Sequence, residues 1–386
     1  MDVSAVRGKP VRFAIGLTAG ESAVGIDAAL ARLKGSGPAL HVKLVDYAHF
    51  PYTSGLRTRL LSVSKGARDM ALLHFELGEA LASAGEAMRH AAGREFAEVD
   101  FVALQGFPAA RVPRRSQSKA AGVLEIGEPA LVAERLGLPV VSEFCYRDVA
   151  AGGQGNVLSA YPSWALLNRA DRTVARLHLG ALARFSVVPP ALEQVASFDV
   201  GPCNMLIDGA AQLVTSGNRQ MDEKGKAAAS GVVLESLLDQ LLEQQYFSRV
   251  PPKATSREEF GPEVYLRKLI AERQGASLED LLATVTTAVA FSILRAYTRF
   301  VKPVYNPSRI ILTGGGTENR KLVTLIREGM PEAVVRKSDE YGLDPAAVDP
   351  LCAAIMGGEA IDGKANNIPT ATGARRPVVC GKLTLP

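Results

Sequence analysis

The segment 144–155, FCYRDVAAGGQG, limits the fold more strongly than any other part of the chain. An apolar run, Leu138–Val141, precedes it, and three of its last four residues are glycines. This order is typical of a buried strand that runs out into a glycine-bearing loop. Because α/β enzymes place reacting groups at the ends of such strands, the segment predicts an α/β fold with a functional site here.

The side chains of this segment indicate proton transfer and sugar binding. Asp148 stands beside Arg147, and a neighbouring cation favours the ionised acid, which can accept a proton from water or a hydroxyl. Gly152 and Gly153 let the backbone approach a polyhydroxy ligand because they have no Cβ. Gln154 can donate to and accept from sugar hydroxyls. The alternative interpretation is a structural Asp that caps a turn.

The composition excludes several classes of partner. With 386 residues the chain is long enough for two domains. Its 44 basic and 40 acidic residues are too balanced to predict binding to nucleic acid or to a membrane surface. The four cysteines form no CxxC pair, which is typical of reduced thiols in the cytosol. No apolar run approaches the roughly 18 residues of a membrane span and no signal peptide is apparent, so we expect a cytoplasmic protein.

The first half of the chain predicts one sheet with helices. Strand patterns at 11–17 and 26–33 flank a small-residue turn, which predicts a hairpin at the start of the chain. We expect further strands at 41–50 and 99–104, and helices at 69–93 and 161–168. The second strand runs into Gln105. A basic segment follows, for which we expect a solvated loop; the alternative is a segment that binds an anionic substrate. Its basic residues are Arg111, Arg114, Arg115 and Lys119.

The second half predicts another sheet. Strands are expected at 173–179, which Gly180 ends, at 198–200, and at 310–313, and helices at 205–213, 230–245, 277–300 and 346–357. Asp199 is expected at a strand end, where it suits a metal-bound water or a backbone amide, with an Asx-turn as the alternative. The strand at 310–313 leads directly into Gly314–Gly316 and a helix from Glu318. Such a junction lets an anionic ligand approach a helix N-terminus.

Several strings, taken in order, resemble the anhydro-N-acetylmuramic acid kinase family, within the sugar kinase, actin and Hsp70 superfamily. Residues 147–155, RDVAAGGQG, match the signature of that family almost letter for letter. Weaker matches span nearly the whole chain and include Ile126-Gly127, Phe198-Asp199, Gly201-Pro202, Asn204, Asp208, Pro252-Lys253, Gly314–Gly316, Asp339–Gly342 and Thr372-Gly373.

The resemblance implies an α/β, two-lobed actin-like fold with a cleft between the lobes, divided into residues 1–168 and 169–386. It implies a kinase that uses ATP, Mg²⁺ and water to open the 1,6-anhydro ring of the sugar and phosphorylate O6, with Asp148 as the general base and a homodimer as the assembly. The nucleotide would lie on Gly20, Ser22, Gly25, Asp27, Gly180, Gly201, Gly314, Gly315 and Gly316. The sugar would lie on Gln105, Arg147, Gly152, Gly153 and Gln154, and Asp199 would reach the metal through water.

The departures from the family pattern fall on the nucleotide side. Glu21 replaces a hydroxyl in the first loop, and Val24 replaces an acid. In the second loop, residues 178–184 lack the two asparagines of the family, and Arg184 is expected to meet phosphate in another way. A carboxylate in a phosphate loop costs on the order of a few kcal/mol unless a cation bridges it. Three hypotheses therefore remain: an active kinase, a non-catalytic amino-sugar-binding relative, and an ATP-independent sugar hydrolase. Nucleotide binding separates the first from the other two.

Overall fold

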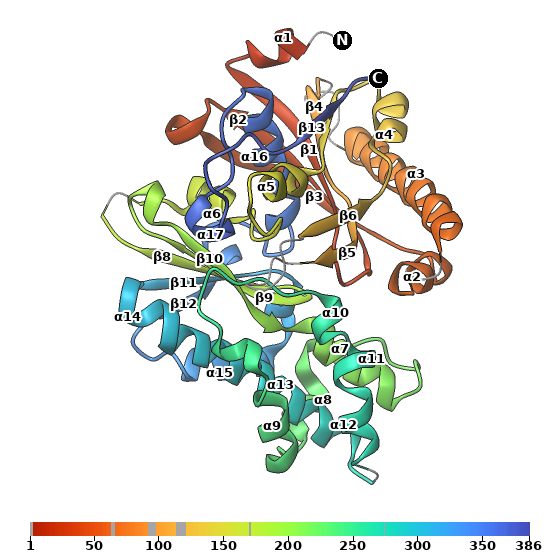
Figure 1. The fold of residues 1–386 in the computed structure, drawn as a ribbon, viewed down its shortest axis with the longest axis vertical. Helices are drawn as coiled ribbons and strands as arrows, with labels where there is room; N and C mark the ends of the chain where they lie inside the picture. Colours follow the sequence, from red (N-terminus) through yellow and green to blue (C-terminus); the bar gives the residue numbers. More distant parts are fainter. Residues whose placement is uncertain (1–2, 63–65, 92–97, 113–120, 170, 274) are drawn as a thin grey trace. The chain divides into compact units, whose positions relative to one another are not determined.

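The computed structural model describes residues 3–62, 66–91, 98–112, 121–169, 171–273 and 275–386 (Figure 1). The chain forms two compact units. Unit 1 contains Met1–Leu167 and Ala346–Pro386, and unit 2 contains Asn168–Pro345. This differs from the contiguous division expected from the sequence, because the C-terminal segment returns to unit 1. Arg114, Arg115 and Lys119 of the basic segment lie outside the described residues.

Unit 1 is built on a six-stranded mixed sheet. The order of its strands is β13 (Lys382–Thr384), β7 (Val140–Ser142), β4 (Phe101–Gln105), β1 (Val11–Ala19), β2 (Gly25–Lys34) and β3 (His41–Pro51). Strands β1, β2 and β3 are antiparallel neighbours, whereas β4 is parallel to β1 and β7 is parallel to β4. The predicted hairpin at the start of the chain is therefore confirmed.

A second hairpin and eight helices complete the described part of unit 1. The hairpin pairs β5 (Phe107–Val112) with β6 (Gly122–Ile126). The helices are α1 (Val3–Arg7), α2 (Ser54–Leu61), α3 (Ala67–Ala91), α4 (Pro129–Leu136), α5 (Phe144–Ala150), α6 (Ala160–Leu167), α16 (Val348–Ile361) and α17 (Pro369–Thr372). Helix α3 buries Leu73, Leu77 and Leu81, which lie on one face at helical spacing.

Packing of helix α16 explains why the end of the chain belongs to unit 1. This helix is apolar on nearly every side and is almost entirely buried. In Figure 1 it lies against strands β1 and β2. A Cβ at Gly16 of β1 would lie 1.8 Å from the carbonyl oxygen of Pro350, so only glycine permits this contact. Strand β13 then pairs antiparallel with β7 at the edge of the sheet.

Unit 2 repeats the strand order of unit 1. Its five-stranded sheet has the order β10 (Ala196–Pro202), β9 (Leu182–Val188), β8 (Val174–Leu179), β11 (Arg309–Thr313) and β12 (Val334–Lys337). Again the first three strands are antiparallel neighbours, and the remaining two run parallel to β8. Each unit thus contains a mixed sheet with the same arrangement of five strands, to which β13 is added in unit 1, and the predicted α/β class is confirmed.

Helices cover the sheet of unit 2 around one long buried helix. They are α7 (Asn204–Val214), α8 (Lys226–Ser230), α9 (Glu235–Leu242), α10 (Arg257–Phe260), α11 (Pro262–Tyr265), α12 (Arg267–Ala271), α13 (Leu278–Ala296), α14 (Lys302–Tyr305) and α15 (Arg320–Glu328). The stretch Leu278–Tyr305 is long and apolar enough to cross a membrane, contrary to the expectation from the sequence. However, 78% of its apolar window is buried, which is typical of a core helix.

Other boundaries also differ from the sequence predictions. The helix expected at 230–245 is the shorter α9, Glu235–Leu242, because α8 ends at Ser230 and Gly231 has an extended backbone. A 3-10 turn, Gly315–Glu318, begins within the glycine triplet, and α15 begins only at Arg320 with Asn319 as its N-cap. Asp199 lies inside β10 rather than at its end.

Candidate functional site

Three parallel strands of unit 1 present the predicted sugar-site residues at one edge of the sheet. Strands β1, β4 and β7 run in the same direction, so their C-terminal ends meet at that edge. The turn 20–24 follows β1, Gln105 is the exposed last residue of β4, and helix α5 follows β7. The ends of parallel strands are where open α/β sheets bind ligands, so the topology brings these segments to one region.

Asp148 lies on helix α5 and not in the glycine loop that the sequence predicts. The strand ends at Ser142, and Glu143, with a left-handed backbone, turns the chain into the helix. Residues Phe144, Cys145 and Asp148 form the buried face of this helix, and Asp148 has no exposed surface. The helix therefore carries the acid into the interior of unit 1.

The hydrogen-bond partners of Asp148 also differ from those expected. Its Oδ1 accepts from Nδ2 of Asn367 over 2.8 Å, and its Oδ2 accepts from the backbone N–H of Gly155 over 3.0 Å. Arg147 is exposed and forms no ion pair with Asp148 in the described structure. Since adjacent helical residues point about 100° apart, Arg147 faces away from the buried carboxylate. Two N–H donors therefore replace the predicted cation.

Asn367 is a site residue that the sequence does not reveal. Its Oδ1 accepts from the N–H of Val378 over 2.7 Å, so its NH₂ group must face Asp148. The only local sign of a polar site in the sequence is the adjacent pair Asn366 and Asn367. Asn366 binds elsewhere, to the backbone of Met356 and Cys380. Asn367 thus orients Asp148, whereas Asn366 joins backbone segments.

The glycine loop after α5 is in contact with the C-terminal segment. A Cβ at Gly153 would lie 2.1 Å from Oδ2 of Asp148, so this position must be glycine for the carboxylate to fit. The N–H of Gln154 donates to the carbonyl of Thr372, and the N–H of Arg375 donates to the carbonyl of Ala151. The C-terminal segment therefore holds both the carboxylate of Asp148, through Asn367, and the glycine loop.

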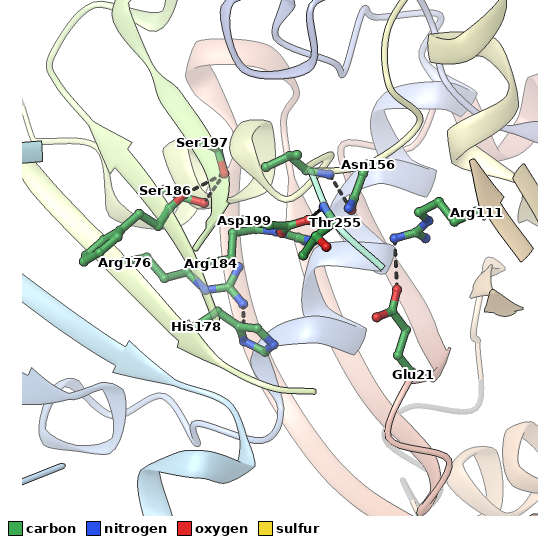
Figure 2. Close-up of polar contacts among 12 residues, drawn as sticks. Glu21, Arg111, Asn156, Arg176, His178, Arg184, Ser186, Ser197, Asp199 and Thr255 are labelled. Atoms are coloured by element: carbon green, nitrogen blue, oxygen red, sulfur yellow. Dashed lines mark hydrogen bonds and ion pairs between the residues drawn. The ribbon is translucent and has the colours of Figure 1, made fainter. Parts of the chain in front are cut away.

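In the first turn, Glu21 forms an ion pair with Arg111 of β5 over 3.0 Å (Figure 2). The side chain of Arg111 is 5% exposed and that of Glu21 is 19% exposed. Arg111, expected in a solvated loop, is thus a buried strand residue. It also lies close to Glu125, whose pKa is raised by burial although Arg111 opposes this. The cation that the sequence requires beside Glu21 is therefore provided by unit 1 itself.

Asp27, a predicted nucleotide residue, has two side-chain partners on the neighbouring strand. Its Oδ1 accepts from the hydroxyl of Tyr47 over 2.7 Å and lies 2.8 Å from Nδ1 of His49. The hydrogen bond to Asp27 raises the pKa of His49. The imidazole also lies against Gly25, where a Cβ would come within 2.7 Å of it. These contacts fix the strand that follows the turn containing Gly20 and Ser22.

The predicted glycines of unit 2 gather around one strand end. Strands β8 and β11 are parallel, and their last residues lead into Gly180 and Gly314 respectively. Cβ atoms at Gly314 and Gly316 would each lie 2.8 Å from the carbonyl oxygen of Leu179. The N–H of Asn204, which begins α7, donates to the carbonyl of Gly180. Gly201 lies nearby in β10 but packs against Phe247.

A row of polar side chains crosses the sheet of unit 2 at this edge. Cross-strand partners place Asp199, Arg184, His178 and Thr313 on the same face of four adjacent strands. Arg184 Nε donates to Asp199 Oδ1 over 2.7 Å. Buried Arg176 donates to Thr313 and also to His178, the second of which can be followed in Figure 2. The positive charge of Arg184 is thus neutralised by an acid of its own unit.

Asp199 also joins a neighbouring segment to the sheet. Its Oδ2 accepts from the N–H of Thr255, and its own N–H donates to the carbonyl of Lys253, each over 3.1 Å. Among the described residues, no three His, Cys, Asp or Glu side chains are placed to hold a metal ion. The donors therefore do not fit direct metal coordination, although the remaining lone pairs of Asp199 can accept from a metal-bound water.

Lys253 is a buried cation beside this row. Its Nζ lies 4.6 Å from the ring centre of Tyr246, 5.2 Å from that of Phe300 and 5.9 Å from that of Phe198. Burial lowers the pKa of Lys253 to about 8, although nearby Asp199 opposes the shift. The aromatic rings hold the segment that carries Thr255 against β10.

Comparison with known proteins gives one consistent result. A family model described as anhydro-N-acetylmuramic acid kinase matches residues 12–386. A protein of that name from Caldanaerobacter subterraneus subsp. tengcongensis is 35% identical over 388 residues, covering 98% of each chain. Another from Salinibacter ruber is 35% identical over 387 residues, covering 97% of this chain and 96% of the relative.

Among solved structures, an activator of 2-hydroxyisocaproyl-CoA dehydratase from Clostridium difficile with bound ADPNP has a TM-score of 0.45 and 13% identity, covering 90% of this chain and 95% of that chain.

Proposed function

Because the chain belongs to the anhydro-N-acetylmuramic acid kinase family, we propose that it converts 1,6-anhydro-N-acetylmuramic acid, ATP and water into N-acetylmuramic acid 6-phosphate and ADP. In this reaction water attacks C1 and gives its proton to Asp148. The bond between C1 and O6 breaks, and O6 takes the γ-phosphoryl group. The observation that carries the proposal is the buried carboxylate of Asp148, which Asn367 and Gly155 hold in one orientation.

The geometry around Asp148 suits the base of this reaction. A general base must be held within hydrogen-bond reach of the proton that it takes. Each carboxylate oxygen has one N–H donor in the structure and retains a second lone pair for a water molecule. Because Gly153 has no Cβ, the backbone of the glycine loop can lie close to Oδ2 of Asp148. Binding of the sugar is assigned to side chains and backbone around this point, namely Gln105, Arg147, Gly152, Gly153 and Gln154.

On the nucleotide side, the phosphates are assigned to the glycine-bearing turns of the two units. These are Gly20, Ser22, Gly25 and Asp27 in unit 1, and Gly180, Gly201 and Gly314–Gly316 in unit 2. Backbone N–H groups in such turns bind phosphate oxygens without a side chain. The two charged departures from the family pattern support an active kinase, because Glu21 and Arg184 are each neutralised within their own unit. The relatives do not favour the non-catalytic or the hydrolytic alternative.

Magnesium is assigned to the phosphates of the nucleotide rather than to a cage of protein side chains. When bound, it offsets the negative charge of the phosphates. Asp199 is assigned a contact with a water of this ion, since its oxygens already accept from Arg184 and Thr255. If this is correct, Asp199→Asn raises the Mg²⁺ concentration that gives half-maximal activity. An unchanged Mg²⁺ dependence would leave Asp199 a purely structural residue. A cytoplasmic location and a homodimer complete the proposal.

The test is a product assay with a binding measurement. Purified protein is incubated with the anhydrosugar, ATP and Mg²⁺ in water enriched in oxygen-18, and the product is analysed by mass spectrometry. We expect a phosphorylated sugar with one labelled oxygen at C1, and a loss of at least about 10³-fold in Asp148→Asn. Calorimetric titration with an ATP analogue then separates the alternatives. Sugar binding without nucleotide binding would indicate a non-catalytic relative, and ring opening without ATP would indicate a hydrolase.

A further inference from the structure

We infer that the guanidinium of Arg375 binds the carboxylate of the sugar acid and thereby selects muramic over glucosamine anhydrosugars. This inference rests on the proposed function and names the part of the substrate that the site distinguishes. It concerns unit 1 alone, and each contact below lies within that unit.

Arg375 is anchored at its backbone while its side chain stays accessible. Its N–H donates to the carbonyl of Ala151 over 2.9 Å, which fixes the residue at the end of helix α5. The side chain then runs across Gly152, whose missing Cβ would lie 2.8 Å from Nη1. Gly152 has a φ of +96°, so glycine is favoured here by its backbone as well as by this contact. Arg375 itself is exposed.

The charge of Arg375 is not neutralised by any acid in the described part of the chain. The side-chain contact found for it is a long hydrogen bond from Nη2 to the carbonyl oxygen of Ala150, at 3.5 Å. A guanidinium has five N–H donors in a planar fork, so most of them stay available to a ligand. By contrast, Arg111 and Arg12 of the same unit both face carboxylates, Glu21 and Asp362 respectively. The guanidinium of Arg375 is thus available to bind an anionic ligand.

The position of Arg375 places this cation beside the base. It covers Gly152, and the next residue, Gly153, lies in contact with the carboxylate of Asp148. A sugar whose C1 lies at Asp148 would therefore have its ring substituents close to Gly152 and Arg375. The family is named for an acid, because muramic acid carries a lactyl ether that ends in a carboxylate. Arginine binds carboxylates in a bidentate manner with good geometric selectivity.

A structural role for Arg375 is the competing explanation. Cations near the last turn of a helix stabilise it, and Arg375 lies at the end of α5. Such a role would affect every substrate equally, whereas recognition of a carboxylate would affect only sugars that carry one. The experiment therefore varies the ligand as well as the protein.

Binding and turnover are measured with 1,6-anhydro-N-acetylmuramic acid, its carboxamide, and 1,6-anhydro-N-acetylglucosamine, which lacks the lactyl group. The proteins are wild type, Arg375→Gln, Arg375→Lys and the matched control Arg376→Gln, which changes the adjacent exposed arginine. In wild type we expect the acid to bind at least about tenfold more tightly than either neutral sugar. In Arg375→Gln this preference should disappear through a rise in KM for the acid alone, with Arg375→Lys intermediate and Arg376→Gln unchanged.

Two results would overturn the inference. One is a wild-type protein that binds the acid and its carboxamide equally well. The other is a loss in Arg375→Gln that is the same for all three sugars, which would assign Arg375 to stabilising α5. Failure of the proposed function has a different signature, namely no phosphorylated product from any of the sugars with wild-type protein and ATP.

Discussion

Asn367 donates a hydrogen bond of 2.8 Å to Asp148 although 219 positions separate the two residues in the sequence. Both side chains are buried, and the other end of the Asn367 amide is fixed by Val378. The orientation of the acid in the middle of the chain is therefore set by a residue close to its end. This relationship makes the role of Asn367 testable separately from its contribution to stability.

We expect Asn367→Leu to lower kcat by about 10²-fold while the Kd of the sugar changes less than about threefold, because a misplaced base slows the reaction without removing the contacts that bind substrate. Steady-state kinetics and calorimetry measure the two quantities. Asn366→Leu is the matched control, since it removes a neighbouring buried amide that does not touch Asp148. An unchanged kcat in folded Asn367→Leu would contradict this prediction.

Gly153→Ala should be severely damaging, since the new Cβ would lie 2.1 Å from the carboxylate oxygen of Asp148. We expect activity to fall by at least about 10²-fold, because the acid or the loop must move. Gly55→Ala is the control, as no atom lies within 4 Å of its Cβ position and helix α2 gains up to about 1 kcal/mol. If both variants retain full activity, the contact between Gly153 and Asp148 does not constrain the base.

The Glu21–Arg111 ion pair should contribute to the stability of unit 1. We expect a double-mutant cycle of Glu21→Gln and Arg111→Met to give a favourable coupling of about 1–3 kcal/mol in urea unfolding, because removing one partner leaves a poorly solvated charge. Arg111→Met should cost more than Glu21→Gln, since Arg111 also faces Glu125. The exposed Arg135–Glu79 pair serves as the comparison and should give a coupling below about 1 kcal/mol. Equal couplings for the two pairs would refute the prediction.

Lys253 should make the stability of the protein depend on alkaline pH. Burial lowers its pKa from 10.5 to about 8, so between these values the unfolded chain holds a proton that the folded chain releases. The free energy of unfolding should therefore rise with pH across this window, by about 3 kcal/mol relative to Lys253→Met. Below pH 8 the difference between the two proteins should be constant. The measurement is urea unfolding of both at pH 7 to 10.5, with Lys43→Met, an exposed lysine, as the control. Parallel curves for wild type and Lys253→Met would show that the buried amine is not the cause.

Local patterns predicted the fold and part of the site. Apolar alternation located the first hairpin, and the glycine triplet after β11 marked the edge of the second sheet. The string around Asp148 located the acid but not its secondary structure, because the glycines that follow predict a loop and the helix before them has only 7 residues. The partners of the charged residues could not be predicted, since Arg111 lies 90 positions from Glu21 and Asn367 lies 219 from Asp148. Such pairings are set by the tertiary fold rather than by neighbours in sequence.

The return of residues 346–386 to unit 1 has a consequence for how the protein is made. Ribosomes deliver about 5–20 residues each second, and domains generally fold as units. Unit 2 is encoded without interruption, so it can fold while translation continues. Unit 1 begins first but lacks α16, β13 and Asn367 until all of unit 2 has been synthesised. Asp148 is thus synthesised long before the residue that orients its carboxylate, and a chain truncated before residue 346 would contain all of unit 2 but would lack the contact from Asn367 to Asp148.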